Sequence, residues 1–180
     1  GADKNTISVL RNVSVSGTLI FAAKQNVAVG TRPYGMAAGD LDGDGKPDLA
    51  VCNWGITTVS ILKNRSTVGT ISLTTDVTLT GLSNPLEVAI GDFDGDSKPD
   101  LAVTNWGGST VSFFRNSNAA TGTMNFPTTA SLTFTTGTTP YSLSIGDVDG
   151  DGKIDLAVTN GTSNTLSVLK NSSTVGALSF

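Results

Sequence analysis

The sequence of 180 residues contains no histidine, a single cysteine (Cys52) and a single glutamate (Glu87). The absence of histidine excludes every catalytic triad that uses imidazole as its base. One cysteine cannot form an internal disulfide or a Cys/His zinc site. Glu87 has Gly35 and Ser142 as its counterparts in the neighbouring internal repeats, and no second free carboxylate stands near it in the repeat. Because Glu87 has no second carboxylate to act with it in acid–base catalysis, the sequence predicts a protein that is not an enzyme.

Long apolar segments are also missing. No run approaches the roughly 18 apolar residues that a membrane span needs, and no signal-peptide pattern opens the chain. No window shows helical periodicity with caps. The chain is instead rich in Thr, Ser, Asn and Gly, a balance that is common in secreted β proteins. The sequence therefore predicts an all-β protein without a membrane span, located outside the cell or at the cell surface.

The acidic residues are concentrated in three short segments. Twelve of the 15 acidic residues lie in segments 40–48, 92–100 and 147–155. The formal net charge is −4, and three bound divalent ions would change it to about +2. A nucleic-acid-binding protein carries a basic patch or stripe instead, so no nucleic-acid partner is predicted. The acidity of the chain is therefore a property of these segments.

Each acidic segment has the same pattern of four aspartates. The first reads Asp40-Leu-Asp-Gly-Asp-Gly-Lys-Pro-Asp48, with carboxylates at its first, third, fifth and ninth residues. Carboxylates this close repel one another without a cation, and a hard divalent ion prefers several oxygen ligands from a flexible loop. Glycine gives the backbone the freedom to surround the ion. The sequence therefore predicts a Ca²⁺ site in each segment; the alternative is a set of metal-free aspartate turns that cap strands.

The predicted ligands of each site are four aspartate side chains and the backbone carbonyl of the seventh residue, a lysine whose side chain points away and partly offsets the charge of the loop. The twelfth position, where an EF-hand has a bidentate glutamate, is valine in every copy, so the ninth aspartate is predicted to close the site. The ligand sets are Asp40, Asp42, Asp44, Lys46 and Asp48; Asp92, Asp94, Asp96, Lys98 and Asp100; and Asp147, Asp149, Asp151, Lys153 and Asp155.

The acidic segments belong to an internal repeat of about 50 residues. Their first aspartates are 52 and 55 residues apart, and a second marker, such as Thr57-Thr-Val-Ser-Ile-Leu-Lys-Asn64, occurs in four copies. Short apolar runs, polar–apolar alternation and turns rich in Asn or Pro predict four short antiparallel strands in each unit. This arrangement favours β-propeller blades over a β-sandwich. The predicted units are a half-blade at 1–30 and repeats at 31–82, 83–137 and 138–180.

These units would supply about 14 strands, or about three and a half blades, whereas closed propellers have about 4 to 8 blades. The chain is therefore expected either to form part of a longer propeller or to complete a ring by homo-oligomerisation. A homodimer is one such form.

The acidic motif and its flanks resemble a known repeat family. The motif follows Ala-Ala-Gly-Asp at 37–40 and precedes Asp-Leu-Ala-Val at 48–51, 100–103 and 155–158. This combination resembles the FG-GAP repeats of the integrin α-subunit propeller. It is more similar still to their bacterial relatives, called VCBS or FG-GAP-like repeats. The resemblance implies a calcium ion in each inner hairpin loop, a seven-bladed propeller when complete and an extracellular setting.

Two features depart from that family pattern. Ser97 replaces the glycine found at Gly45 and Gly152, which strains the second loop if this residue needs a positive φ. The FG and GAP elements are present only loosely, as Tyr34-Gly35 and as Ala38-Gly39.

These observations predict a non-catalytic, calcium-binding propeller module for extracellular recognition or adhesion, with a protein or carbohydrate ligand. Trp54 and Trp106 are candidate ligand-contacting residues, although loop aromatics more often pack between blades. One alternative is a lectin-like propeller that binds a saccharide between blades, and another is the accessory propeller of a secreted polysaccharide-acting enzyme. A basic residue ends each marker strand and is interpreted as a charge that prevents edge pairing: Arg11, Lys63, Arg115 and Lys170.

Overall fold

The computed structural model describes residues 5–180, and all regular structure in this range is β-strand. No helix of these residues is long and apolar enough to cross a membrane. The thirteen strands are β1 (Thr6–Val9), β2 (Gln25–Ala28), β3 (Pro33–Gly39), β4 (Asp48–Asn53), β5 (Thr58–Asn64), β6 (Leu73–Leu79), β7 (Pro85–Gly91), β8 (Asp100–Asn105), β9 (Thr110–Phe114), β10 (Leu132–Thr135), β11 (Pro140–Gly146), β12 (Asp155–Asn160) and β13 (Thr165–Leu169).

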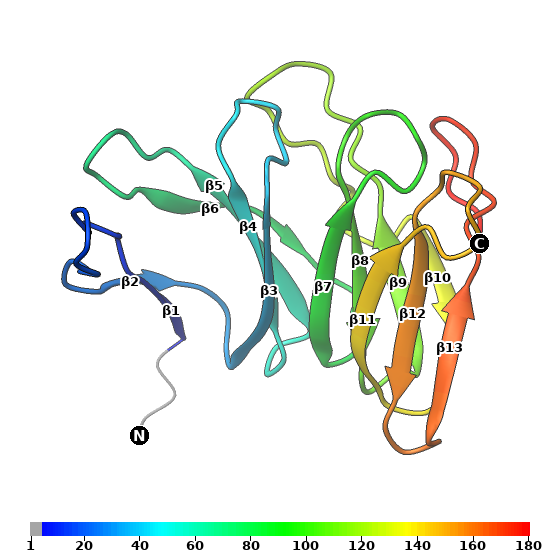
Figure 1. Cartoon of the computed structure of the whole chain (residues 1–180). Coiled ribbons are helices and arrows are strands. Elements are labelled where there is room, and N and C mark those ends of the chain that lie inside the picture. The colour runs from blue at the N-terminus through cyan, green and yellow to red at the C-terminus, as the bar shows by residue number, and fades with distance from the viewer. Residues whose placement is uncertain (1–4) are drawn as a thin grey trace.

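The strands form four open antiparallel sheets from neighbours in the sequence. The first sheet contains β1 and β2, the second β3 to β6, the third β7 to β10, and the fourth β11 to β13. Figure 1 shows the sheets following one another from the blue first sheet to the orange fourth sheet, with β3, β7 and β11 side by side. The prediction of an all-β chain with four-stranded antiparallel units is confirmed for the second and third sheets.

The last unit differs from the prediction. The fourth sheet has three strands instead of the expected four, so residues 5–180 contain thirteen strands. After β13 the chain turns back on itself through a bridge between Thr174 and Ala177. The ring of Phe180 then stacks on Phe113 at a centroid distance of 4.3 Å. This terminal hairpin packs against the third sheet and adds no strand to β13. Residues 1–4 of the expected half-blade lie outside the described range.

Apolar residues pack between neighbouring sheets. Successive side chains of a strand point to opposite faces, so a strand that is buried on both faces is apolar along its length. In β4, Ala50 and Cys52 face the core shared with the third sheet, whereas Val51 faces the core shared with the first sheet. In β8, Leu101 faces the second sheet and Ala102 faces the fourth. The cores therefore lie between the sheets, and Cys52 is fully buried.

The first strands of the second and third sheets approach closely at Gly35. A Cβ atom at this position would lie 2.3 Å from the carbonyl oxygen of Leu86 in β7. Only glycine therefore fits at this point of β3. The close approach keeps β3 and β7 adjacent, and with them the acidic segments that follow these two strands.

Candidate metal centres

The three acidic segments lie at one edge of the molecule. Residues 40–48 join β3 to β4, residues 92–100 join β7 to β8, and residues 147–155 join β11 to β12. We call these segments loop 1, loop 2 and loop 3. Because β3, β7 and β11 run side by side, the loops emerge together at the upper edge of Figure 1. Each one turns a hairpin between the first and second strands of its sheet, as the sequence predicts.

Backbone hydrogen bonds to carboxylates give each loop its shape. In loop 1, Asp40 accepts the N–H groups of Gly43 and Gly45, both at 2.8 Å. Asp42 accepts the N–H group of Asp44 at 3.0 Å. Loop 3 repeats these bonds at the equivalent positions. An ionised carboxylate has about four acceptor positions, so each of these aspartates keeps capacity for a metal ion.

The turn of each loop uses backbone conformations that favour glycine. Gly43 and Gly45 have φ angles of 75° and 83°. In loop 2 the second of these positions is Ser97, whose φ is 66°. The position therefore needs a positive φ, and Ser97 is a non-glycine residue held in the left-handed region. Its N–H group still donates to Asp92 at 2.8 Å, which is the bond that Gly45 makes in loop 1.

The structure brings three carboxylates of each loop to one point. One oxygen of each carboxylate lies within 4.8 Å of the others, so that a single cation can contact all three. All donors are carboxylate oxygens in a glycine-containing loop, a set that suits Ca²⁺ and other hard divalent ions better than zinc or copper. The groups are Asp40, Asp42 and Asp48; Asp92, Asp94 and Asp96; and Asp147, Asp149 and Asp151.

The ninth aspartate of each loop also organises the surrounding backbone. Asp100 is fully buried and accepts the N–H groups of Phe93 and Asn116 at 3.1 and 2.7 Å. Asp48 and Asp155 accept the equivalent pairs of N–H groups. These bonds tie the start of the loop to the end of the third strand of the same sheet. The ninth aspartate therefore holds three segments of its sheet together.

Burial affects the ninth carboxyl group differently in the three loops. Desolvation raises the pKa of Asp48, and it raises the pKa of Asp100 to about 7 in spite of the N–H donors. In loop 3 the pKa of Asp155 is lowered, mainly by its two backbone N–H donors. Loops 1 and 2 are more enclosed than loop 3, whose aspartates before Asp155 are exposed. A bound cation would offset the cost of the buried charge in loops 1 and 2.

The metal-free protein is expected to lose stability as the pH rises from about 4 to about 7. The pKa of Asp100 is about 7 in the folded chain and 3.8 ordinarily, so in this range the folded state keeps a proton that the unfolded state releases. The resulting stability is fully present below the ordinary pKa of 3.8. It is lost as the pH rises through the pKa of Asp100 in the folded chain. Asp48 acts in the same direction.

Thermal unfolding of protein stripped of divalent ions, followed by circular dichroism at a series of pH values, measures this decline. Asp100→Asn removes the titration of this group and should flatten the decline. A melting temperature that increases steadily from about pH 4 to about pH 7 would contradict the expectation.

A basic side chain from the end of the third strand contacts the loop of its own sheet. In loop 2, Arg115 lies 2.5 Å from Asp94 and 2.8 Å from Asp96. The paired residues are separated by 21 positions, and this constant spacing is the sequence signal that connects them. From the sequence, these basic residues are interpreted as charges that prevent pairing of strand edges. In the structure they instead neutralise part of the charge of the acidic loop. The equivalent pairs are Lys63 with Asp42 and Lys170 with Asp149.

The lysine at the seventh position points away from the carboxylates in one loop only. Lys98 lies 3.4 Å from Asp96, and Lys46 makes the same contact in loop 1 at 3.9 Å. In loop 3, Lys153 instead donates to the carbonyl oxygen of Ser173 at 2.9 Å. The expectation that these side chains point away therefore holds for loop 3 and is wrong for loops 1 and 2, where each lysine lies near the fifth aspartate and offsets part of the loop charge.

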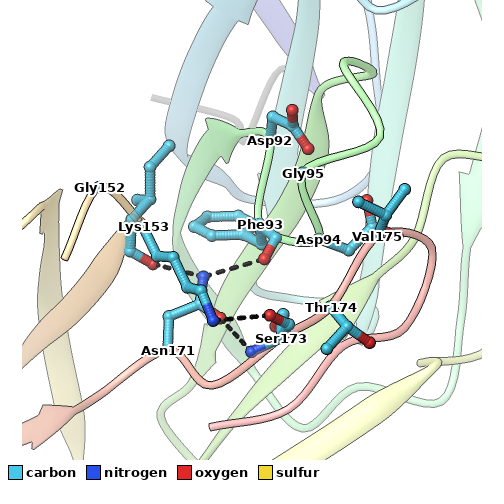
Figure 2. A pocket seen from close by; sticks show the side chains of 11 residues that line it. Asp92, Phe93, Asp94, Gly95, Gly152, Lys153, Asn171, Ser173, Thr174 and Val175 are labelled. Atoms are coloured by element: carbon cyan, nitrogen blue, oxygen red, sulfur yellow. Dashed lines mark hydrogen bonds between the residues drawn. The ribbon is translucent and has the colours of Figure 1, made fainter.

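A pocket of about 580 Å³ lies between loops 2 and 3. Loop 2 lines it with residues 92–95, loop 3 with residues 152–154, and the terminal hairpin with residues 173–175. Figure 2 shows Asn171 between the two loops, with its side-chain amide bonded to the carbonyl oxygen of Phe93. The loops are therefore separated by open space along this pocket and joined through Asn171.

Trp54 and Trp106 lie at the opposite ends of the strands from the acidic loops. They follow β4 and β8, and their rings meet edge to face with centroids 6.1 Å apart. The guanidinium group of Arg32 lies 5.2 Å from the Trp54 ring centroid, and Asn84 donates to the Trp54 carbonyl oxygen at 3.1 Å. The ring contact and the Asn84 bond connect the second and third sheets, the packing that is common for loop aromatics. A ligand role for the two tryptophans stays a prediction.

Comparisons with known proteins identify a repeat family and a fold. The family described as FG-GAP-like repeat matches residues 1–51 and 92–158. One similar solved structure is the crystal structure of a functionally unknown protein from Desulfotomaculum acetoxidans DSM 771, with a TM-score of 0.64 and 20% sequence identity. The match covers 99% of this chain and 52% of that chain, so this chain spans about half the length of its structural relative. At this identity the likeness concerns the fold alone. None of the curated proteins matches the sequence.

Proposed function

This chain belongs to the FG-GAP-like repeat family, and on that premise we propose that it is a Ca²⁺-binding β-propeller module without catalytic activity, serving recognition or adhesion outside the cell. The observation that supports the proposal best is that each of three equivalent hairpin loops has three carboxylates with oxygens within 4.8 Å of one another. The first and third aspartates take part in every loop, together with the ninth in loop 1 and with the fifth in loops 2 and 3. A hard divalent cation is the partner that suits such a group.

Each residue type of the loop has a role in the proposed site. The first, third and fifth aspartates supply carboxylate oxygens, the ninth closes the site, and the seventh residue supplies its backbone carbonyl. The bound ion supplies the positive charge that the basic side chains provide only in part. Because all ligands come from one short loop, ion binding and loop ordering are the same event, and the binding free energy contributes to folding.

The propeller arrangement is supported by a comparison of equivalent sheet faces. Val59 and Ile61 of β5 are fully buried in the core shared with the third sheet. Their counterparts in β13, Leu166 and Val168, are 61% and 54% exposed. The outer face of the fourth sheet thus has the apolar pattern of a face that another sheet covers. A further sheet of the same kind, from this chain or from a second copy, would cover it, and continued repetition of this packing generates a propeller.

The proposed absence of catalysis is supported by how the acidic groups are used. Nearly all carboxylates are in the three loops, and the sequence has no imidazole. Glu87 is half-buried, and desolvation raises its pKa. The proposal therefore assigns the loops a structural role and leaves recognition of a protein or carbohydrate to other surfaces.

Calorimetric titration of the metal-free protein with Ca²⁺ is expected to show three ions per chain. Dissociation constants of roughly 10⁻⁴ to 10⁻³ M are typical of extracellular Ca²⁺ modules. Asp40→Asn, Asp92→Asn and Asp147→Asn should each remove one ion, because each deletes a carboxylate of one group.

Asp76→Asn is the matched control for these variants. Asp76 lies outside the loops, 3.3 Å from Arg65, so its variant should still bind three ions. A protein that binds no Ca²⁺, or loop variants that bind as many ions as the unmodified chain, would overturn the proposal.

A further inference from the structure

The side chain of Asn116 lies between loops 1 and 2 and is fully buried. Its Nδ2 group donates to the carbonyl oxygen of Leu41 in loop 1 at 2.8 Å and to that of Pro99 in loop 2 at 3.2 Å. Its backbone N–H group donates to Asp100 at 2.7 Å. A side-chain amide has two N–H donors, and here each loop receives one of them. Asn116 therefore bridges two acidic loops that are distant in the sequence.

Asn171 makes the same bridge between loops 2 and 3. It is 1% exposed, and its Nδ2 group donates to the carbonyl oxygens of Phe93 and Ile154, both at 2.9 Å. Its Oδ1 atom accepts the N–H group of Ser173 at 2.8 Å. Figure 2 shows these bonds converging on one side chain, so the orientation of the amide is fixed from both ends.

A continuous path of hydrogen bonds runs through these asparagines. Leu41 donates its N–H group to Asp48 at 3.0 Å and accepts from Asn116 with its carbonyl oxygen. One loop residue and one asparagine thus connect the closing aspartate of loop 1 to loop 2. The equivalent path from loop 2 to loop 3 runs through Phe93 and Asn171.

Asn64, the counterpart of Asn116 in the second sheet, bonds to its own loop 1 but does not connect this loop to another one. Its Nδ2 group donates to the carbonyl oxygen of Pro47, and its N–H group donates to Asp48, both at 2.8 Å. The first sheet carries no acidic loop, and among residues 5–180 Asn64 makes no bond to a second loop. Asn64 and Asn116 therefore have the same role in their own loops and differ in the bridge.

From this geometry we propose that Asn116 and Asn171 are positioning residues that couple neighbouring loops, so that Ca²⁺ binds with positive cooperativity. The inference rests on the proposed function, because it requires the loops to bind Ca²⁺. An ion that orders one loop fixes the carbonyl oxygen that the asparagine uses. A buried amide hydrogen without a partner is unfavourable, so the asparagine is satisfied only when both loops are closed. Closure of one loop therefore favours closure of the next, and linkage makes the effect reciprocal.

Ca²⁺ titrations of the unmodified chain and two matched variants test the coupling. The unmodified chain should bind its ions with a Hill coefficient clearly above about 1. Asn116→Ala removes the bridge between loops 1 and 2 and should lower the Hill coefficient. Asn64→Ala removes the equivalent bond within one loop and should leave the Hill coefficient unchanged. If Asn116 had only a structural role, Asn116→Ala would lower the stability of the protein but would leave the Hill coefficient the same as in Asn64→Ala.

A variant of loop 1 tests the same coupling with both asparagines in place. Asp40→Asn weakens ion binding in loop 1, and the affinity of the two remaining sites should then fall about tenfold, within the roughly 5- to 150-fold range of such couplings. In an Asn116→Ala background the same substitution should leave loops 2 and 3 unaffected.

Independent binding of three ions, with loops 2 and 3 unaffected by Asp40→Asn, would overturn the coupling and leave the proposed function intact. A chain that binds no Ca²⁺ would overturn both. The Asp40→Asn measurement stands by itself if Asn116→Ala does not fold.

Discussion

Removal of Ca²⁺ with excess EDTA is expected to lower the melting temperature by roughly 15 to 30 °C relative to the protein in about 10 mM Ca²⁺. An ion at about 100 times its dissociation constant stabilises the folded chain by about 2.7 kcal/mol, so three ions contribute about 8 kcal/mol. A chain of this length changes its melting temperature by about 2 to 4 °C for each kcal/mol. Scanning calorimetry with and without the chelator measures the shift.

Two controls isolate the effect of the ions. Excess Ca²⁺ added back over EDTA should restore the original melting temperature. Asp40→Asn, which impairs one of three sites and weakens the others through the proposed coupling, should show a chelator effect that is smaller by at least about a third. An unchanged melting temperature in excess EDTA would mean that the three loops are metal-free aspartate turns.

Replacement of Phe113 by alanine is expected to destabilise the protein by about 3 to 5 kcal/mol. The ring is fully buried and stacks on Phe180 at 4.3 Å between centroids. It also meets Phe93 and Phe134 edge to face at 5.5 and 6.2 Å. Truncation therefore opens a cavity at the centre of the core between the third and fourth sheets. Urea unfolding in saturating Ca²⁺ measures the loss while the loops remain loaded.

Phe21→Ala serves as the matched control for this substitution. Its ring is 50% exposed, so its removal should change the free energy of unfolding by less than about 0.5 kcal/mol. A loss of less than about 1 kcal/mol for Phe113→Ala would contradict a close-packed core between the third and fourth sheets.

The parts of the structure that depend on contiguous residues could be predicted from the sequence. Nine residues such as Asp40 to Asp48 determine their own hairpin, because the carboxylates bond to N–H groups only two to five positions away. The need for a positive φ at Ser97 also follows from its alignment with Gly45. Repetition at a nearly constant interval then predicts successive four-stranded sheets.

The contacts between distant positions could not be predicted in the same way. Asn116 reaches Leu41 across 75 positions, and this bond depends on how closely the third sheet packs on the second. Arg115 reaches Asp94 only through the pairing of β9 with β8, which sets the distance between strand end and loop. The contacts of Phe180 could not be predicted either, because its ring packs against Phe93, Phe113 and Phe134, an aromatic cluster that the linear pattern does not reveal.

Each hydrophobic core joins two neighbouring sheets, and among residues 5–180 no core joins all four. The free energy of the fold is therefore close to a sum of sheet terms and nearest-neighbour interface terms, as in a linear array. The second and third sheets have an interface on both faces, whereas the first and fourth have one. Local opening of such an array is expected to start at its outer members, so loop 3 should open more often than loops 1 and 2 unless a further sheet covers the fourth. Loops of nearly identical chemistry would then differ in lifetime because of their positions in the array.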